Sequence, residues 1–539
     1  MRGMIRNAIY LTCLCIILLL VSCSSFSPVP GKTSMPGNSS GGISSAPATP
    51  AEITPAEITA GTEAAKETEE AKPTEEAKPT EAATPEEKSP LNQYKMNLTL
   101  DTVENTISGN ETVTVYNDSE DTWNELCFRD YPSLFAPDGG SGYDSDGAIS
   151  EINQVKDLTN GSDLVVSRDG EDSSVIYIGL SVPLKAGENR KIEFHFTAYI
   201  PELGSRYGFM DGVYNLANFY PVLAVYENGG WSTEPYFLWG ECFYSKVSNY
   251  QATLSVPLGI TVISSGLSHI DTISDGRATW EISAEKVRDF AVVAGTGYAQ
   301  TSIKVDGITV NCYYRNNDAK WGAAALEAGA AAVQIFGGTF GEYPYPELDI
   351  VETYLDAGGM EYPNIVMISD RLGSYSGKTS FLRIVVVHEV AHQWFYGLVG
   401  DNQYTEAWLD ESFASYSELV YKATFTDAEE IEQEVDYLEE SLMSEGIPDE
   451  ADAYYVNKSY SEFDSDSAYT FTVYMRGEVF LFRLREAMGV YVFNMAMQEY
   501  VAEYSYKEAA TDDFEALITK YAGENPSVAA LLAKYLRQP

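Results

Sequence analysis

The first half of the chain alternates apolar and polar residues with the period of two that is typical of β-strands. The alternation runs from about residue 91 to 300 and is clearest in "YKMNLTLD", "NRKIEFHFTAYI" and "NYQATLSVPL". Turn-forming sequences such as "AGEN" and "ENGG" separate the strand-like segments. We therefore predict an all-β domain of sheets and hairpins over residues 91–302.

The pattern becomes helical after about residue 310. Helices are predicted for three segments: "NDAKWGAAALEAGAAAVQIFGGTFG", "KTSFLRIVVVHEVAHQWFYG" and "AWLDESFASYSELVYKATF". A strand, "PELDIVETY", lies between the first and the second. From the third helix to Pro539 we predict mostly helix, interrupted by an acidic loop around 444–467. Residues 303–539 should therefore form a mainly helical α/β domain.

The N-terminus has the features of an export signal. A basic start, "MRGMIR", precedes the apolar run "AIYLTCLCIILLLVS", which is short for a membrane span. Its end, "LVSC", resembles the bacterial lipoprotein signal, and this resemblance implies removal of residues 1–22 and attachment of lipid to Cys23. We therefore expect an exported protein anchored by lipid to the outer face of a bacterial membrane, with no span of its own.

Residues 23–90 have the composition of a linker. Ser, Gly and Pro give way to "EEAKPTEEAKPTEAATPEEKSP", which has almost no apolar residues. Such a segment cannot bury enough surface to offset its ordering entropy, and its prolines and charges favour extended chain. We interpret it as a stalk between the lipid and the folded domains.

Composition narrows the possible partners. The chain has 539 residues, 45% hydrophobic residues and a formal net charge of −46. It is long enough for two domains with their own cores, and its acidity argues against a nucleic-acid partner because few cations would neutralise phosphates. Cys127 lies in the apolar, strand-like context "WNELCFRD", which predicts a buried thiol.

Two histidines in the second predicted helix form a candidate metal site. His388 and His392 are four residues apart, so their side chains lie on one face of a helix, and Glu389 can address a water molecule beside them. The chain has only four histidines, and the other two, His195 in a predicted strand and His269 in a predicted loop, lie in the β domain.

The third ligand must then be a carboxylate, because no cysteine follows the motif. A packed helix that returns to the first one should supply it, and the next predicted helix begins near Trp408. The candidates on that helix are Asp410, Glu411 and Glu418.

Both segments resemble the gluzincin aminopeptidases, the family of aminopeptidase N and leukotriene A hydrolase. The family has HExxH, then eighteen residues, then a glutamate inside "WLNEGFA"; here "HEVAH" is followed at that spacing by Glu411 in "WLDESFA". The resemblance implies one Zn²⁺ per chain, held by His388, His392 and Glu411. It also makes Glu389 the general base and suggests that Glu418 orients a ligand histidine.

Two further stretches match the family. "DAGGMEYPN" resembles its "GGMEN" or "GAMEN" loop, which implies that Gly358, Gly359 and Met360 line the extended substrate and that Glu361 binds its free α-ammonium. This chain departs from the loop at Tyr362, where the family has Asn.

The segment "SAYTFTVYMRGEV" resembles the family's "Y…YEKG" segment. Tyr474 then takes the place of the tyrosine that stabilises the oxyanion, and Tyr469 that of a second active-site tyrosine. Some members draw a second N-terminus-binding acid from the β domain, and Glu241 is a candidate for it.

The resemblance covers about 91–539 and implies an N-terminal β saddle followed by a thermolysin-like catalytic domain. The expected function is a zinc aminopeptidase that removes N-terminal residues from peptides outside the cell. Longer members carry a further helical domain after the catalytic one, and an endopeptidase on the same zinc site is an alternative for a chain that ends here. A non-catalytic surface adhesion module is a second alternative, against which the intact ligands and base argue.

Overall fold

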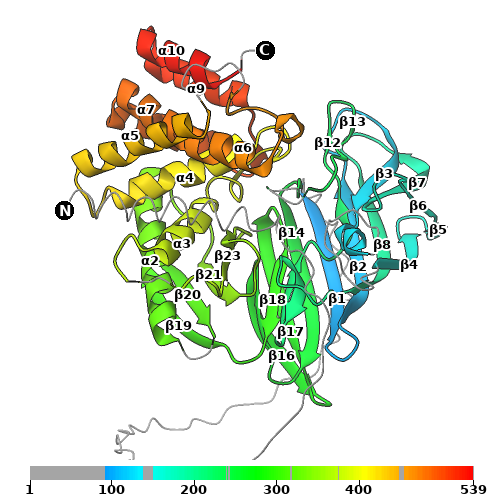
Figure 1. Ribbon diagram of the computed structural model, residues 1–539. Helices are drawn as coiled ribbons and strands as arrows, with labels where there is room; N and C mark the ends of the chain where they lie inside the picture. The colour runs from blue at the N-terminus through cyan, green and yellow to red at the C-terminus, as the bar shows by residue number, and fades with distance from the viewer. Residues whose placement is uncertain are drawn as a thin grey trace, which may run out of the picture. The chain divides into compact units, whose positions relative to one another are not determined.

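The structure is a computed structural model (Figure 1). It describes residues 91–136, 150–237, 240, 243–315, 318–373, 376–447 and 454–537. The predicted export signal (1–22) and the linker (23–90), with Cys23, lie outside the described residues, as does Glu241. Within the described part no helix is both long enough and apolar enough to cross a membrane.

The first part of the described chain is built from strands, as predicted. These are β1 (Asn92–Asp101), β2 (Thr106–Tyr116), β3 (Trp123–Arg129), β4 (Ser150–Asp157), β5 (Ser162–Leu164), β6 (Val166–Arg168), β7 (Val175–Leu184), β8 (Asn189–Tyr199), β9 (Tyr207–Met210), β10 (Val213–Ala217), β11 (Val222–Leu223), β12 (Tyr226–Glu227), β13 (Gly230–Trp231), β14 (Ser248–Pro257), β15 (Thr261–Ser264), β16 (Leu267–Ser274), β17 (Arg277–Val287) and β18 (Ala291–Gly295). A 3₁₀ turn, Tyr131–Phe135, follows β3.

An eight-stranded sheet dominates this part, in the order β16-β17-β14-β1-β2-β8-β4-β5. Its pairs are antiparallel except β1 with β14. Every second residue of β8 is buried, so the sequence alternation places one face of this strand on the core. Two four-stranded sheets, β15-β18-β10-β9 and β11-β3-β7-β6, complete the sheet-rich part.

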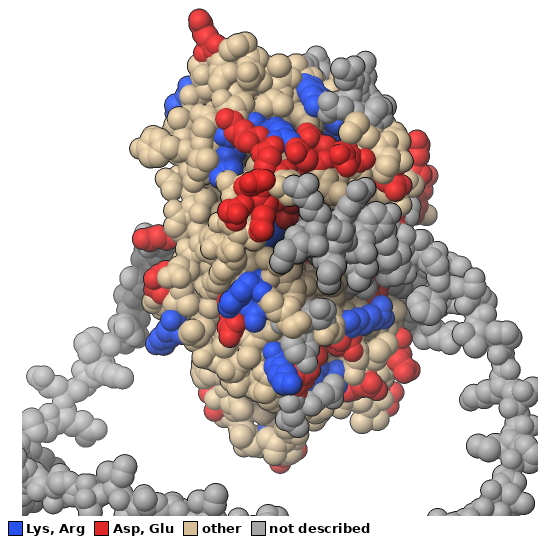
Figure 2. Space-filling model, turned by 60° about the vertical axis from the view of Figure 1, so that its left-hand side comes forward, with Lys and Arg blue, Asp and Glu red and all other residues tan. Residues whose placement is uncertain are grey.

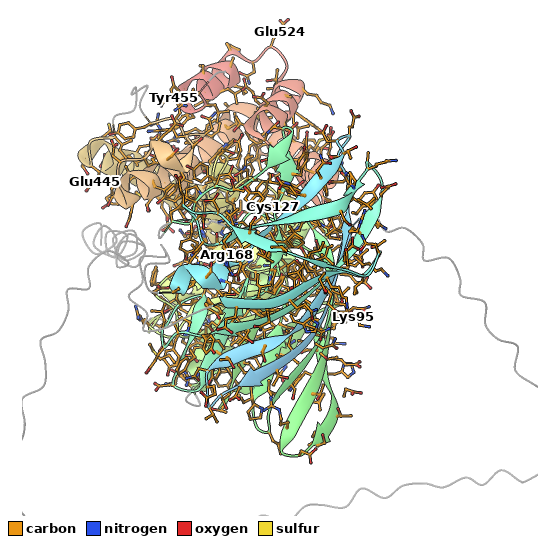
Figure 3. All side chains as sticks on the ribbon, turned by 90° about the vertical axis from the view of Figure 1, so that its right-hand side faces the viewer. Lys95, Cys127, Arg168, Glu445, Tyr455 and Glu524 are labelled. Atoms are coloured by element: carbon orange, nitrogen blue, oxygen red, sulfur yellow. The ribbon has the colours of Figure 1, made fainter. Side chains whose placement is uncertain are left out.

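Two sequence-based expectations can be checked in these sheets. Cys127 is a buried free thiol, as predicted, and burial raises its pKa to about 12; Figure 3 shows it within the sheet-rich part. The placement of His269 in a loop is wrong, because it lies in β16. That strand is almost wholly exposed, so it lacks the alternation that reveals a half-buried strand.

The second part combines a small sheet with helices. Its elements are β19 (Ala299–Val305), β20 (Ile308–Tyr314), α2 (Ala319–Thr339), β21 (Glu347–Thr353), β22 (Gly359–Met360), β23 (Ile365–Ser369), α3 (Phe381–Ala391), β24 (Val399–Gly400), α4 (Trp408–Lys422), α5 (Ala428–Ser444), the 3₁₀ turn Tyr460–Glu462, α6 (Asp466–Thr470), the π-helical turn η4 (Phe471–Arg476), α7 (Gly477–Met488), α8 (Val490–Tyr504), β25 (Lys507–Glu508), α9 (Thr511–Ala522) and α10 (Pro526–Tyr535).

The five-stranded sheet has the order β19-β20-β21-β23-β22, with β20, β21 and β23 parallel and β22 antiparallel at the edge. Helices α2 and α3 pack against it, and the helices labelled α4, α5, α6, α7, α9 and α10 stack beyond α3 (Figure 1). Sheet membership changes between β18 and β19, so the predicted division at 302/303 falls inside β19; that division stays a prediction. The structure thus has an N-terminal sheet-rich domain followed by a mixed sheet and helix domain, which confirms the predicted fold class.

The surface of the helical part is strongly acidic. Figure 2 shows a band of Asp and Glu side chains there, with Lys and Arg among them. Arg483 of α7, for example, forms ion pairs with Glu432, Asp436 and Glu439 of α5. Much of the negative charge in this region therefore lies on a solvated face.

Candidate metal centre

Helix α3 carries the first two candidate ligands at its C-terminal end. It is buried on nearly all sides, as its apolar sequence predicts, and includes His388 and Glu389. The expectation that it continues to Gly397 is wrong, because it ends at Ala391 and His392 is its C-cap. The chain turns there: Tyr396 has a positive φ of 113°, and the Gly397 amide donates to the His392 carbonyl at 2.8 Å.

The two histidines converge on one carboxylate of α4. Nε2 of His388 lies 3.2 Å from Oε2 of Glu411, and Nε2 of His392 lies 3.4 Å from the same oxygen. One potential ligand atom from each of the three residues lies within 4.8 Å of the others. Of the three acids that elimination left open, Glu411 is therefore the one that faces both imidazole nitrogens.

The other two acids hold the outer nitrogens of the same rings. Oε1 of Glu418 lies 3.1 Å from Nδ1 of His388, which agrees with the orienting role expected for it. Asp410 makes a short hydrogen bond to Nδ1 of His392. A carboxylate on the far nitrogen fixes the tautomer and direction of a metal-binding imidazole. The contact of Asp410 with His392 was not predicted from the sequence, although Asp410 is next to Glu411 on α4 and so lies close to the site.

These carboxylates make the centre strongly attractive to positive charge. Burial lowers the pKa of His388, but hydrogen bonds to Glu411 and Glu418 outweigh it and raise that pKa to about 10. For His392, burial also acts to lower the pKa, and the contact with Asp410 reverses this and raises it well above its ordinary value. A divalent cation binds such a donor set in exchange for protons, so the residues present fit a zinc ion.

The end of β22 brings a second glutamate to the site. Glu361, Glu389 and His392 each offer an atom within 4.8 Å of the others, and all three are buried. Glu361 directly follows Met360, the last residue of β22. The predicted substrate-binding loop and the metal motif therefore meet in space, although about thirty residues separate them in the chain.

Gly359 is needed for this close approach. A Cβ atom there would lie 2.3 Å from Oε1 and 2.4 Å from Cδ of Glu389, whereas a Cβ atom at Gly358 would meet only Val385 methyls at 3.7 Å or more. The two adjacent glycines therefore differ sharply in the room that surrounds them.

Tyr474 reaches the centre from a π-helical turn, a distortion that is frequent at functional sites. Its phenol donates to Oε1 of Glu411 at 2.5 Å, and its ring stacks on His388 with centroids 6.0 Å apart. The turn packs closely on α4: Oγ of Ser412 donates to the Val473 carbonyl, and a Cβ atom at Gly477 would lie 1.9 Å from that hydroxyl oxygen.

Tyr469 lies next to Tyr474. Its ring centroid is 6.1 Å from that of Tyr474, and its other aromatic neighbours are Tyr460 and Phe463. A Cβ atom at Gly240 would approach its hydroxyl to 3.0 Å. An active-site role for Tyr469 stays a prediction.

Fold and site together give a sheet-rich part followed by a mixed sheet and helix part, which carries two histidines and one glutamate that could hold a metal ion. Residues 324–535 match the family model described as Peptidase family M1 domain. The part of the chain that is similar to this family includes His388, His392 and Glu411, the three residues of the candidate metal centre.

Curated M1 aminopeptidases and a solved M1 zinc metallopeptidase structure are also similar to this chain. Aminopeptidase M1-B of Oryza sativa subsp. japonica is 30% identical over 43% of this chain and 28% of its own length. Aminopeptidase M1 of Arabidopsis thaliana is 29% identical over 43% and 27%. The chain thus spans less than a third of the length of these two relatives. An M1 zinc metallopeptidase from Deinococcus radiodurans shares the fold, with a TM-score of 0.59, 16% identity and coverage of 83% of this chain and 95% of its own.

We predict that Gly359→Ala lowers the rate of peptide hydrolysis by about 100-fold, because the methyl group displaces Glu389 by roughly an ångström. Gly338→Ala, on the exposed side of α2 and away from the predicted substrate-binding loop, is the control, since nothing lies within 4 Å of a Cβ atom there. Both purified variants would be assayed for kcat on aminoacyl-anilides and for zinc content. Equal activities of the two variants would contradict the close-approach argument.

Proposed function

We propose that this protein is a zinc-dependent aminopeptidase that cleaves N-terminal residues from peptides. The observation that carries the proposal is the meeting of two motifs. His388, His392 and Glu411 form a compact donor set. Potential ligand atoms of Glu361, Glu389 and His392 also lie within 4.8 Å of one another. The proposed hydrolytic centre would thus lie beside a buried carboxylate that can pair with a chain end. The names of the M1 relatives support the same activity.

His388, His392 and Glu411 would hold the zinc ion. When bound, zinc polarises a carbonyl group and lowers the pKa of water. Glu418 and Asp410 keep the two imidazoles aimed at the ion through their outer nitrogens. The protein therefore supplies both the ligands and the hydrogen bonds that hold them in place.

Glu389 is the proposed general base. Its carboxylate is buried beside His392, where it can accept a proton from the attacking water and return it to the leaving amine. The Tyr474 phenol, which points into the same centre, can donate to the oxyanion that forms on the former carbonyl oxygen. Proton transfer and charge stabilisation thus come from different elements, α3 and η4.

Glu361 and β22 set the register of cleavage. β22 is the edge strand of its sheet, so an extended peptide can pair with its backbone by β-augmentation. Glu361, at the end of that strand, would receive the free α-ammonium, and a charge-assisted hydrogen bond there favours a chain end over an internal residue. An M1 structure from Deinococcus radiodurans with a Tyr-Ser-Ala substrate supports peptides as the substrate class.

We predict that Glu389→Gln retains zinc but lowers kcat by at least about 1,000-fold, because the amide keeps the size of the side chain and cannot accept the water proton. Metal content by atomic absorption and kcat on an aminoacyl-anilide panel, with and without a chelator, test this. Glu440→Gln, on the exposed side of α5, serves as the control substitution. Full activity of Glu389→Gln would exclude it as the base.

We predict that Glu361→Ala abolishes the preference for free over acetylated N-termini. Glu361→Gln, which keeps the shape and loses the charge, should show most of the same loss if ion pairing gives the preference. The measurement is the ratio of kcat/KM for matched free and N-acetylated peptides. An unchanged ratio in both variants would remove the exopeptidase assignment and favour an endopeptidase on the same zinc site.

We also propose that the protein acts outside the cell, attached by lipid at Cys23. The support is the sequence "LVSC" after a basic and apolar start, followed by a long polar linker. In cells fed a fatty-acid analogue, the wild-type protein should take up the label and sediment with membranes, whereas Cys23→Ser should do neither. Absence of label on the wild-type protein would contradict the proposal.

A further inference from the structure

A strained residue, Tyr396, lies in the turn after α3. Tyr396 has φ 113°, a backbone conformation that side chains other than glycine rarely adopt, and it is 3% exposed. Such strain persists only where surrounding contacts over-determine it, and it concentrates at functional sites. The contacts of Tyr396 therefore indicate what the strain accomplishes.

Two residues of the sheet-rich part hold Tyr396 at both ends. Its hydroxyl donates a short hydrogen bond to Asp289, and its carbonyl accepts from Nε of Arg288 at 2.9 Å. Both partners lie in the segment between β17 and β18. The turn that ends the metal helix is thus tied to the other domain through its side chain and its backbone.

Asp289 is itself fixed by neighbours in the sheet-rich part. It is 1% exposed and accepts from Oγ of Ser245 at 2.9 Å and from Nδ2 of Asn218 at 3.1 Å. These donors leave its other oxygen for the Tyr396 hydroxyl. The Asp289 carboxylate is therefore held in position by the sheet-rich part to accept the Tyr396 hydroxyl.

Arg288 fills the junction between the two parts. Its Nη1 donates to the Ser245 carbonyl at 2.9 Å and to Oε1 of Glu508 at 2.8 Å, and its Nη2 donates to the Lys507 carbonyl at 3.2 Å. A Cβ atom at Gly400, in β24, would lie 2.1 Å from its Cζ. The guanidinium thus packs tightly against the β24–β25 pair that follows the turn.

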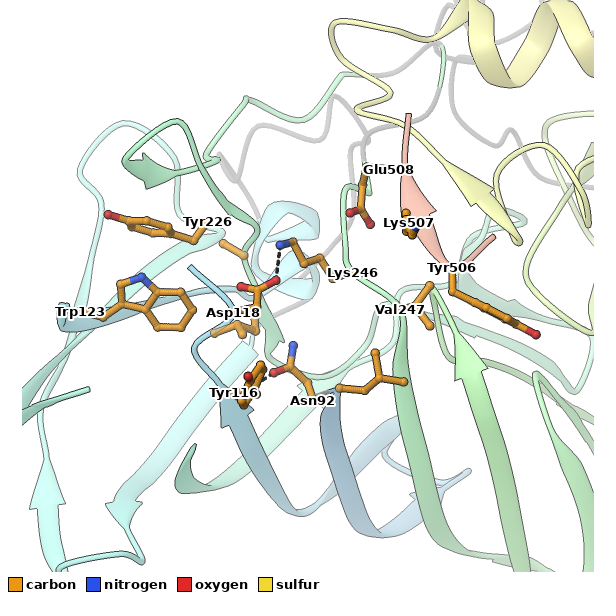
Figure 4. A pocket seen from close by; sticks show the side chains of 13 residues that line it. Asn92, Tyr116, Asp118, Trp123, Tyr226, Lys246, Val247, Tyr506, Lys507 and Glu508 are labelled. Atoms are coloured by element: carbon orange, nitrogen blue, oxygen red, sulfur yellow. Dashed lines mark hydrogen bonds and ion pairs between the residues drawn. The ribbon is translucent and has the colours of Figure 1, made fainter. Parts of the chain in front are cut away.

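The outer end of this network opens to solvent. Glu508 and Lys507 line a cavity of about 210 Å³, together with Asp118 and Lys246, which form an ion pair (Figure 4). The Glu508 side chain is 27% exposed and that of Arg288 is 1% exposed. The contacts of Arg288 to the Tyr396 and Ser245 carbonyls are therefore the ones shielded from water.

The held turn bears directly on a metal ligand. Phe395 precedes Tyr396, and the carbonyl oxygen of Phe395 lies 3.2 Å from Nδ1 of His392. The Gly397 amide after Tyr396 donates to the His392 carbonyl. The residues on both sides of Tyr396 thus contact His392, one at the ring and one at the backbone.

We propose that Tyr396, held by Arg288 and Asp289, is a positioning residue for His392, so that the sheet-rich domain helps to build the metal centre. The proposal rests on the zinc site of the proposed function. The strained turn directs the Phe395 carbonyl to the imidazole of His392. The contacts from the sheet-rich domain keep the turn in that conformation.

The test measures zinc affinity by competition with a chromophoric chelator, and ligand geometry by the visible spectrum of the Co²⁺-loaded protein. Tyr396→Phe should weaken zinc binding about tenfold and change the spectrum, at the lower end of the loss typical for residues behind metal ligands. Tyr396→Gly should weaken binding at least as much, although it relieves the backbone strain. The double variant Tyr396→Phe/Asp289→Asn should lose little more than Tyr396→Phe, since both changes affect one contact.

Tyr207→Phe is the matched control. It removes another buried hydroxyl, which donates to the Tyr199 carbonyl at 2.8 Å inside the sheet-rich part, and should leave zinc affinity and the spectrum unchanged even if stability falls. Zinc affinities within twofold of wild type for both Tyr396 variants, with an unaltered Co²⁺ spectrum, would overturn the positioning role. A wild-type protein that binds no zinc would overturn the proposed function itself.

Discussion

The shared contact of two imidazole nitrogens with one carboxylate oxygen is the interaction around which the catalytic half is organised. His388 and His392 reach Oε2 of Glu411 only if α3 and α4 pack at one register. That register also places Asp410 and Glu418 on the outer nitrogens. Helix α4 therefore supplies both the third candidate ligand and the carboxylates that orient the two histidines.

Absent side chains make this packing possible. A Cβ atom at Gly359 would overlap Glu389, one at Gly477 would overlap Ser412, and one at Gly400 would overlap Arg288. Each glycine allows a different pair of segments to pack closely: β22 on α3, the end of the turn with Tyr474 on α4, and β24 on the sheet-rich part. At these positions the lack of a side chain matters more than backbone freedom, because none of the three has the positive φ that favours glycine.

The negative charge of the buried acids near the site is partly balanced by a lysine on α4. Nζ of Lys422 lies 3.2 Å from Oε2 of Glu418 and 3.0 Å from Oε1 of Glu434, and its side chain is only 10% exposed. The coulombic attraction of this ammonium group opposes burial, and with the bond to His388 it lowers the pKa of Glu418. Burial instead raises the pKa of nearby Glu478 well above its ordinary value. The charge on Glu418 is thus balanced by His388 and by Lys422, one helical turn away.

The sequence by itself predicted a strand-rich first part followed by helices, the buried thiol of Cys127 and a candidate metal site at His388 and His392, because periodicity and residue spacing are local properties. It also limited the third ligand to three acids and, through a family resemblance, selected Glu411. Where the metal helix ends, the strand that contains His269, the contact of Asp410 with His392 and the hold of Arg288 and Asp289 on Tyr396 were decided only by the tertiary structure. Each of these depends on which distant segment packs against the residue, and that is not encoded in its own neighbourhood.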